Sequence, residues 1–146
     1  MPATDKGREE NMKISAKGVY AIEIMLDIME YGGRTPVAIK DVAARRDISG
    51  KYAEQVVGTL NFAGLVRSTR GPKGGYFATE AARTATVGTI LRLTENVLKE
   101  HDQDQENMSL TNVIKDLEHA IDKVLDSYTL VDILESMHDS ADNYVI

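Results

Sequence analysis

Apolar residues recur at three- and four-residue steps in the first half of the chain, which is the pattern of amphipathic helices. The first helix is expected to begin after Ser15, a residue type favoured at N-caps, and to end at Gly32. Its apolar stripe comprises Tyr20, Ala21, Ile24, Met25, Ile28 and Met29. A short helix over 40–46 and a third helix between Ser49 and Gly64 follow. The third helix is expected to bury Ala53, Val56, Val57, Leu60 and Ala63.

A hairpin is predicted after these helices. Residues 65–69 and 76–79 are expected to be strands, because the segment between them is dominated by Gly and Pro. Residues 36–39 are short and extended and predict a minor third strand. Three helices followed by a hairpin is the order of a winged helix-turn-helix. The pattern therefore predicts a mostly α fold, with a winged helix-turn-helix domain over 12–94 and a small two- or three-stranded β wing. That domain ends with a helix capped by Thr86.

The second half of the chain is organised differently. Residues 95–109 are strongly polar and predict a loop. From Leu110, apolar residues recur with heptad-like spacing and predict a long amphipathic helix, followed by a last helix that ends at Met137. Thr129 and Asp132 have the spacing of a capping box for that last helix. Polar residues 138–146 are expected to be a flexible tail, and residues 1–11 a disordered extension.

Charge is divided between the two halves. The net charge is −6, but residues 12–78 carry ten Lys and Arg against six Asp and Glu, whereas residues 79–146 carry five against fourteen. A basic face attracts phosphate locally, because distant acidic groups are screened over a Debye length of about 10 Å. The acidic total therefore does not exclude nucleic acid as a partner.

Several functional classes are disfavoured by what the sequence lacks. The chain has no cysteine, which excludes disulfides, cysteine nucleophiles and cysteine-ligated metal or iron–sulfur sites. It has no apolar run near the roughly 20 residues that span a bilayer and no signal-peptide pattern, so we expect a cytoplasmic protein. Residues 71–75 are not a phosphate-binding P-loop, because they lie in a hairpin without the following Ser or Thr. We expect no enzymatic activity, no cofactor and no metal.

The polar face of the third helix is a candidate DNA-reading surface. Its residues are Ser49, Lys51, Tyr52, Glu54 and Gln55. Gln suits adenine edges, Glu accepts a hydrogen bond from cytosine N4, and Ser or Lys holds phosphate. An ordinary solvated helix face fits the same pattern equally well. The pattern alone leaves both interpretations open.

The hairpin tip is more informative. Arg70 and Lys73 lie on a glycine-rich turn with little side-chain bulk, which is suited to entering a minor groove. Arg67 projects from the same short hairpin. At the start of the first helix, Ser15 and Lys17 are candidates for phosphate contacts, although an N-cap role accounts fully for Ser15.

Three motifs in register, at 13–21, 48–55 and 64–76, resemble the Rrf2 family of bacterial transcriptional regulators. The resemblance covers residues 12–94 and implies a homodimeric repressor that binds double-stranded DNA at a palindromic operator, with 110–137 forming the dimerisation helices. By position it implies base contacts from Tyr52, Glu54 and Gln55, and minor-groove contacts from Arg70 and Gly71. It implies phosphate contacts from Ser15, Lys17, Tyr20, Ser49 and Lys51.

The resemblance also bears on sensing. Cluster-binding members of the family carry three cysteines in the segment that matches 95–109, and this chain has none, so it is similar to the cluster-free cysteine-metabolism repressor. That repressor acts in complex with O-acetylserine thiol-lyase (cysteine synthase). The C-terminal Tyr144, Val145 and Ile146 look like the isoleucine-ended tails that dock this enzyme. The alternative function is therefore an enzyme-binding protein with DNA binding secondary. The simpler interpretation of the tail is a frayed terminus that happens to end in Ile.

Overall fold

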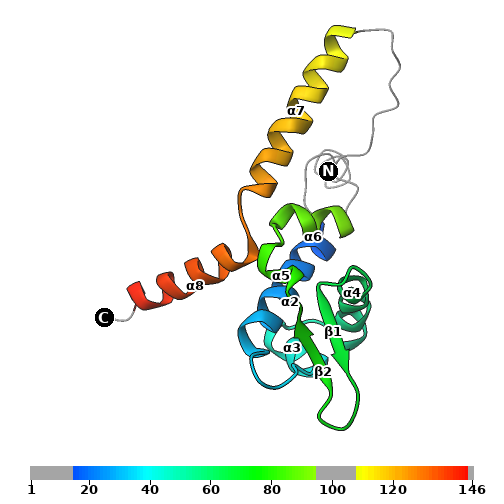
Figure 1. Cartoon of the computed structure of the whole chain (residues 1–146), viewed down its shortest axis with the longest axis vertical. Helices are drawn as coiled ribbons and strands as arrows, with labels where there is room; N and C mark the ends of the chain where they lie inside the picture. Colours follow the sequence, from blue (N-terminus) through cyan, green and yellow to red (C-terminus); the bar gives the residue numbers. More distant parts are fainter. Residues whose placement is uncertain (1–14, 95–107, 145–146) are drawn as a thin grey trace, which may run out of the picture.

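The computed structural model describes residues 15–94 and 108–144, which form a mostly helical chain with one two-stranded sheet (Figure 1). In the described part of the chain, three helices come first, then a hairpin, two short helices and two long ones. Their bounds are α2 (Ala16–Tyr31), α3 (Ile39–Arg46), α4 (Gly50–Phe62), β1 (Val66–Thr69), β2 (Gly75–Ala78), α5 (Ala81–Thr84), α6 (Val87–Thr94), α7 (Met108–Asp126) and α8 (Leu130–Tyr144). The expected fold class, mostly α with a small β wing, is confirmed.

The first half folds around one aliphatic core. Ser15 accepts a hydrogen bond from the Gly18 N–H at 3.2 Å and begins α2, and Ser49 accepts one from the Tyr52 N–H at 3.1 Å and begins α4. Helices α2, α3 and α4 turn their apolar stripes toward each other and toward the wing. The fully buried side chains include Ile24, Met25, Ile28, Val42, Val56, Val57 and Leu60. The apolar periodicity of the sequence therefore identifies the core correctly, except that Ala63 is exposed at the end of α4.

The wing is an antiparallel hairpin in which Val66 lies opposite Ala78 and Thr69 opposite Gly75. Val37 adds a single bridge to Tyr76 through two backbone hydrogen bonds of 2.9 Å, so the expected third strand is reduced to one residue. A Cβ at Gly75 would lie 2.3 Å from the Val37 carbonyl oxygen, so only glycine allows this close approach. The bridge attaches strand β2 of the wing to the segment between α2 and α3.

Helices α7 and α8 differ in their attachment to this core. In Figure 1, α7 projects away from the winged domain. α8 begins with the predicted capping box, in which the Asp132 N–H donates to the Thr129 hydroxyl at 3.0 Å and the Thr129 N–H donates to the Asp132 carboxylate at 3.2 Å. Leu130 is fully buried, and Ile133 and Leu134 pack against the core. No helix in the described part of the chain is long and apolar enough to cross a membrane.

Two helix boundaries and one short helix differ from the sequence prediction. Helix α8 continues to Tyr144 instead of ending at Met137, because no Gly or Pro interrupts the polar segment that was expected to be a flexible tail. Helix α7 begins at Met108, inside the segment expected to be a loop. Helix α5 was not predicted, since a single turn carries no periodicity. The predicted extension 1–11, most of the predicted loop and the last two residues lie outside the described residues.

Candidate DNA-binding surface

Helix α4 is presented by a tight turn after α3. Asp47 closes α3 with a positive φ of 54°, and the Ile48 N–H donates to the Ala43 carbonyl at 3.0 Å. The chain then enters α4 through the Ser49 cap. Ala53, Val56 and Val57 face the core, so the opposite face of α4 carries the exposed side chains Lys51, Glu54 and Gln55. The predicted reading face is thus exposed at the first turns of the second helix of a helix-turn-helix.

Tyr52 is placed differently from its neighbours. Its ring meets that of Tyr20 edge to face, with 5.7 Å between centroids and 81° between planes, and both residues are half-buried. Lys17 lies three residues before Tyr20, on the same face of α2. The tyrosine pair therefore joins the beginning of α2 to the beginning of α4, and brings Lys17, Tyr20 and Tyr52 onto one surface.

The wing tip extends from the domain as a turn closed by a hydrogen bond from the Gly74 N–H to the Gly71 carbonyl at 2.9 Å (Figure 1). The tip residues Arg70, Gly71 and Lys73 are all exposed. Gly71 has a backbone φ of 115°, which residues other than glycine rarely adopt. A Cβ at Gly74 would lie 2.4 Å from the Thr69 carbonyl oxygen. The turn therefore needs glycines, and it leaves two cationic side chains at its end.

A buried ion pair that the sequence analysis missed fixes α3 against α2. Asp27 is fully buried among the apolar residues of α2. Arg45 donates to it twice, from Nη2 to Oδ1 at 2.7 Å and from Nε to Oδ2 at 3.0 Å, and the Arg46 Nε lies 3.4 Å from Oδ2. The hydrogen bond to Asp27 raises the pKa of Arg45, whose guanidinium also lies 4.3 Å from the centre of the Tyr31 ring. An acidic residue beside Ile28 in the apolar stripe was the available signal.

This pairing changes the interpretation of the basic half. Arg45 and Arg46 are directed toward Asp27, so they contribute less to an outer basic face than their charge suggests. In the ranges that the structure describes, Lys51, Arg70 and Lys73 form no ion pair. Cationic groups thus remain available on α4, where phosphate contacts were predicted, and on the wing tip, where minor-groove contacts were predicted.

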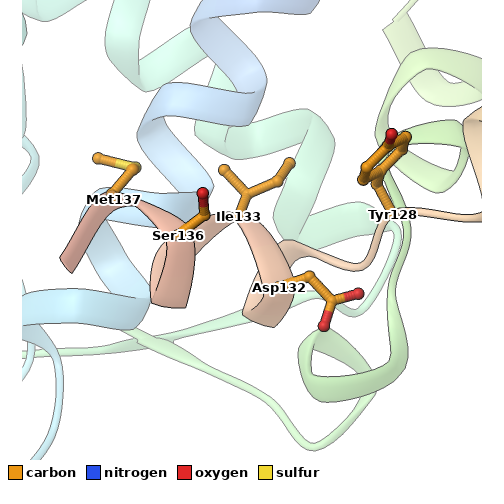
Figure 2. Close-up of a pocket in the computed structure, with 5 residues that line it drawn as sticks. All are labelled: Tyr128, Asp132, Ile133, Ser136 and Met137. Carbon is orange, nitrogen blue, oxygen red and sulfur yellow. The ribbon is translucent and has the colours of Figure 1, made fainter. Parts of the chain in front are cut away.

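The C-terminal helix carries an open pocket of about 590 Å³ (Figure 2). It lies along one side of α8 and is lined by Tyr128, Asp132, Ile133, Ser136 and Met137. The Asp132 carboxylate already accepts the capping hydrogen bond, and the other lining groups are mostly apolar. The pocket therefore lacks the convergent polar groups of a small-molecule site. Tyr144, from the predicted enzyme-binding tail, is the last residue of α8, and Val145 and Ile146 lie outside the described residues.

A helix-turn-helix with an exposed polar reading face and a basic wing defines a DNA-binding transcriptional regulator of the winged type. A family model described as Rrf2, an iron-dependent transcriptional regulator, matches residues 14–136. The regulator CymR of Bacillus subtilis is 36% identical over 126 residues, which are 84% of this chain and 89% of CymR. The chain belongs to the Rrf2 family.

Two further comparisons support this assignment. The regulator IscR of Vibrio vulnificus (strain YJ016) is 42% identical over 80 residues, which are 55% of this chain and 48% of IscR. Among solved structures, CymR of B. subtilis has a TM-score of 0.74 at 34% identity, and the match covers 85% of this chain and 97% of the CymR chain. IscR of T. potens has a TM-score of 0.73 at 36% identity, with coverages of 88% and 90%.

The iron dependence in the family description does not fit the donor groups of this chain. The sequence contains no cysteine, so no thiolate is available to an iron–sulfur cluster. Within 15–94 and 108–144, no three His, Asp or Glu side chains are grouped so that they could hold a metal ion. We therefore derive no step of DNA binding through iron.

Proposed function

We propose that this regulator is a homodimeric repressor that binds a palindromic operator and controls genes of cysteine or sulfur metabolism. The observation that carries the proposal is the joint exposure of Gln55 and Glu54 on α4 and of Arg70 on the wing tip, on a winged fold that its relatives share. In such folds the start of the second helix enters the major groove, while the wing lies against the backbone or the minor groove.

Each predicted contact has a physical role. Gln55 pairs with an adenine edge, Glu54 accepts from cytosine, and the Tyr52 ring contacts a base while Tyr20 holds it. Ser15, Lys17, Ser49 and Lys51 contact phosphate near the first turns of α2 and α4, where unpaired backbone N–H groups also attract anions. Arg70 and Lys73 enter the minor groove, and Gly71 lets the backbone approach it.

The dimer is proposed from the surface of α7. No described side chain between 109 and 126 is fully buried in this chain. Val113, Leu117 and Val124 are 62%, 51% and 60% exposed, and with Ile114 and Ile121 they form a stripe of heptad-like spacing. An apolar stripe of this length needs a cover, and a second copy supplies an identical one through two-fold symmetry. Two winged domains would then face a two-fold symmetric operator.

The regulon is proposed from similarity. CymR, whose solved structure is described as that of the global cysteine regulator of B. subtilis, matches this chain over most of both lengths. This chain also lacks the thiolates that an iron–sulfur sensor requires. Repression follows physically if the bound dimer occupies a promoter and excludes the polymerase.

Capture of genomic DNA tests this proposal. The full-length protein is mixed with fragmented genomic DNA of its source organism, and the bound fragments are sequenced. We expect an inverted repeat upstream of genes for cysteine or sulfur metabolism. An inverted repeat upstream of unrelated genes would overturn the regulon and keep the DNA-binding role, whereas the absence of any enriched motif would overturn both.

The enzyme-binding alternative rests on the C-terminal residues alone. Because α8 is helical up to Tyr144, an extended docking peptide would require its last turn to unwind. Deleting residues 144–146 is expected to abolish binding to O-acetylserine thiol-lyase in calorimetry and to leave operator affinity within about twofold, since the deletion lies far along the chain from α4 and the wing. Equal enzyme binding with and without these residues would exclude the tail as the docking element.

A further inference from the structure

The C-terminal end of α7 is held by one arginine of α6. Arg92 donates from Nη1 to the Asp126 Oδ1 at 2.8 Å, and from Nη2 to the Asp126 Oδ2 at 3.0 Å and the Asp122 Oδ1 at 2.8 Å. The Thr86 hydroxyl donates to the same Asp126 Oδ1 at 2.9 Å. Asp122 and Asp126 are one helical turn apart, so a single guanidinium holds two successive turns of α7. We refer to Arg92, Asp122, Asp126 and Thr86 as the α6–α7 clamp.

The surrounding backbone is built to accommodate this clamp. The Val87 N–H donates to the Tyr128 carbonyl at 2.9 Å, and the Leu130 N–H donates to the Ala85 carbonyl at 3.0 Å. A Cβ at Gly88 would lie 2.6 Å from the Asp126 Oδ1 and 2.9 Å from the Arg92 Nη1. Gly88 thus leaves the space that the clamp fills.

The clamp lies at the C-terminal end of α7, and the rest of the helix extends away from it. Among the described elements, α7 packs chiefly against α6. From Asp122 to the start of α7 at Met108 the helix extends about 21 Å at a rise of 1.5 Å per residue. A tilt of about 10° at the clamp would move the far end of α7 by about 3 to 4 Å, which is close to the rise of about 3.4 Å per base pair.

Stability alone does not account for such an arrangement. The clamp side chains of Arg92, Asp122 and Asp126 are 43%, 39% and 49% exposed, and exposed ion pairs contribute little to folding. A planar guanidinium that binds two carboxylates does, however, restrict the orientation of α7 relative to α6. We propose that Arg92 is a positioning residue, which sets the angle between α7 and the winged domain and thereby the half-site spacing that the dimer accepts. This inference rests on the proposed dimeric DNA-binding function.

The experiment uses operator duplexes whose two half-sites are separated by the natural spacer or by one base pair more or fewer. Binding by the full-length dimer is measured for the wild type, Arg92→Met and Gly88→Ala. Gly88→Ala keeps every charge but displaces the clamp, so it remains informative if Arg92→Met folds poorly. Arg83→Met is the matched control, because Arg83 of α5 pairs with Glu80, the residue before that helix, and the two side chains are 76% and 82% exposed.

We expect the wild type and Arg83→Met to prefer the natural spacer by about tenfold, and both clamp variants to prefer it by less than about threefold. Because the chain has no cysteine, Asn61→Cys on α4 also allows one spin label per protomer, and the distance distribution between the two labels should broaden in the clamp variants. Unchanged spacer ratios and distances in both clamp variants, with the wild type binding normally, would overturn the inference. Failure of the wild type to bind any spacer would instead overturn the proposed function.

Discussion

The winged domain buries most of its apolar residues, whereas helix α7 leaves most of its apolar residues exposed. In α4 the stripe of Val56, Val57 and Leu60 is fully buried by other parts of the same chain. In α7 the comparable stripe stays exposed, with Val113 and Leu117 more than half accessible. The core of the first unit is complete within one chain, whereas we propose that a second copy covers the stripe of α7. The winged domain therefore carries the proposed DNA contacts, whereas α7 carries the proposed dimer interface.

Charge separates the same two regions. The residues of α4 and the wing that we propose to face DNA include Lys51, Arg70 and Lys73, whereas the residues from 79 onward carry a large acidic excess. Acidic side chains repel phosphate, so this distribution disfavours DNA contacts by α7 and α8. A chain with a net charge of −6 can therefore bind DNA through one face.

The largest effect is expected from a variant that disrupts the proposed dimer interface on α7. Leu117→Asp places a charge in the middle of the apolar stripe, so the dimer should dissociate and operator affinity should fall by at least about 100-fold, because two linked half-site contacts become one. Analytical ultracentrifugation and fluorescence anisotropy measure the two effects. Asn112→Asp adds the same charge at another exposed position of α7 and should change neither. A dimer that persists in Leu117→Asp would show that this stripe is not the interface.

The winged domain should be most sensitive inside its core. Asp27→Ala leaves Arg45 and Arg46 without their buried carboxylate and should lower the free energy of unfolding by about 2 to 3 kcal/mol. This loss is smaller than that for a fully buried pair, because Arg45 is partly exposed. Urea denaturation measures the change. Glu80→Ala, which breaks an exposed pair with Arg83, should change it by less than about 0.5 kcal/mol. Similar losses in the two variants would contradict the assigned role of Asp27.

Changes on the DNA-reading surface should leave stability intact and alter binding. Arg70→Ala should weaken binding to all duplexes by about tenfold, while Gln55→Ala should reduce discrimination at one base pair by about 1 to 3 kcal/mol. Anisotropy titrations against a set of single-base operator variants distinguish the two patterns. If neither variant differs from the wild type, the assignment of these residues to the DNA contact is wrong.

The smallest expected effect concerns the pH dependence of the clamp. The hydrogen bond from Arg92, and next that from Thr86, lowers the pKa of Asp126 below its ordinary range. The contribution of this carboxylate is therefore present above the ordinary carboxyl pKa of about 3.9 and is lost as the pH falls through the lowered value. The difference in melting temperature between the wild type and Arg92→Met should be constant from pH 8 to pH 5 and shrink in stronger acid. A difference that changes between pH 8 and pH 5 would implicate another titrating group.

Local features were predictable from the sequence and distant pairings were not. The caps at Ser15 and Ser49, the core stripe of α4 and the wing turn each depend on a few neighbouring residues. The pairing of Asp27 with Arg45, and that of Arg92 with Asp126, joins residues far apart in the chain, and no periodicity indicates which charges meet. The extent of α8 was also missed. Its last turns are polar, so no apolar periodicity indicates a helix there, although no helix-stopping residue interrupts them.

The most direct test of the account is a titration of the captured operator with the full-length protein, followed by anisotropy and native mass spectrometry. The same protein is titrated against a duplex that holds one half-site, with the other half scrambled. We expect two chains on each complete operator and an affinity at least about 100-fold higher than for the half-site duplex. One chain per operator, or equal affinity for the two duplexes, would contradict the proposal that two winged domains read the DNA together.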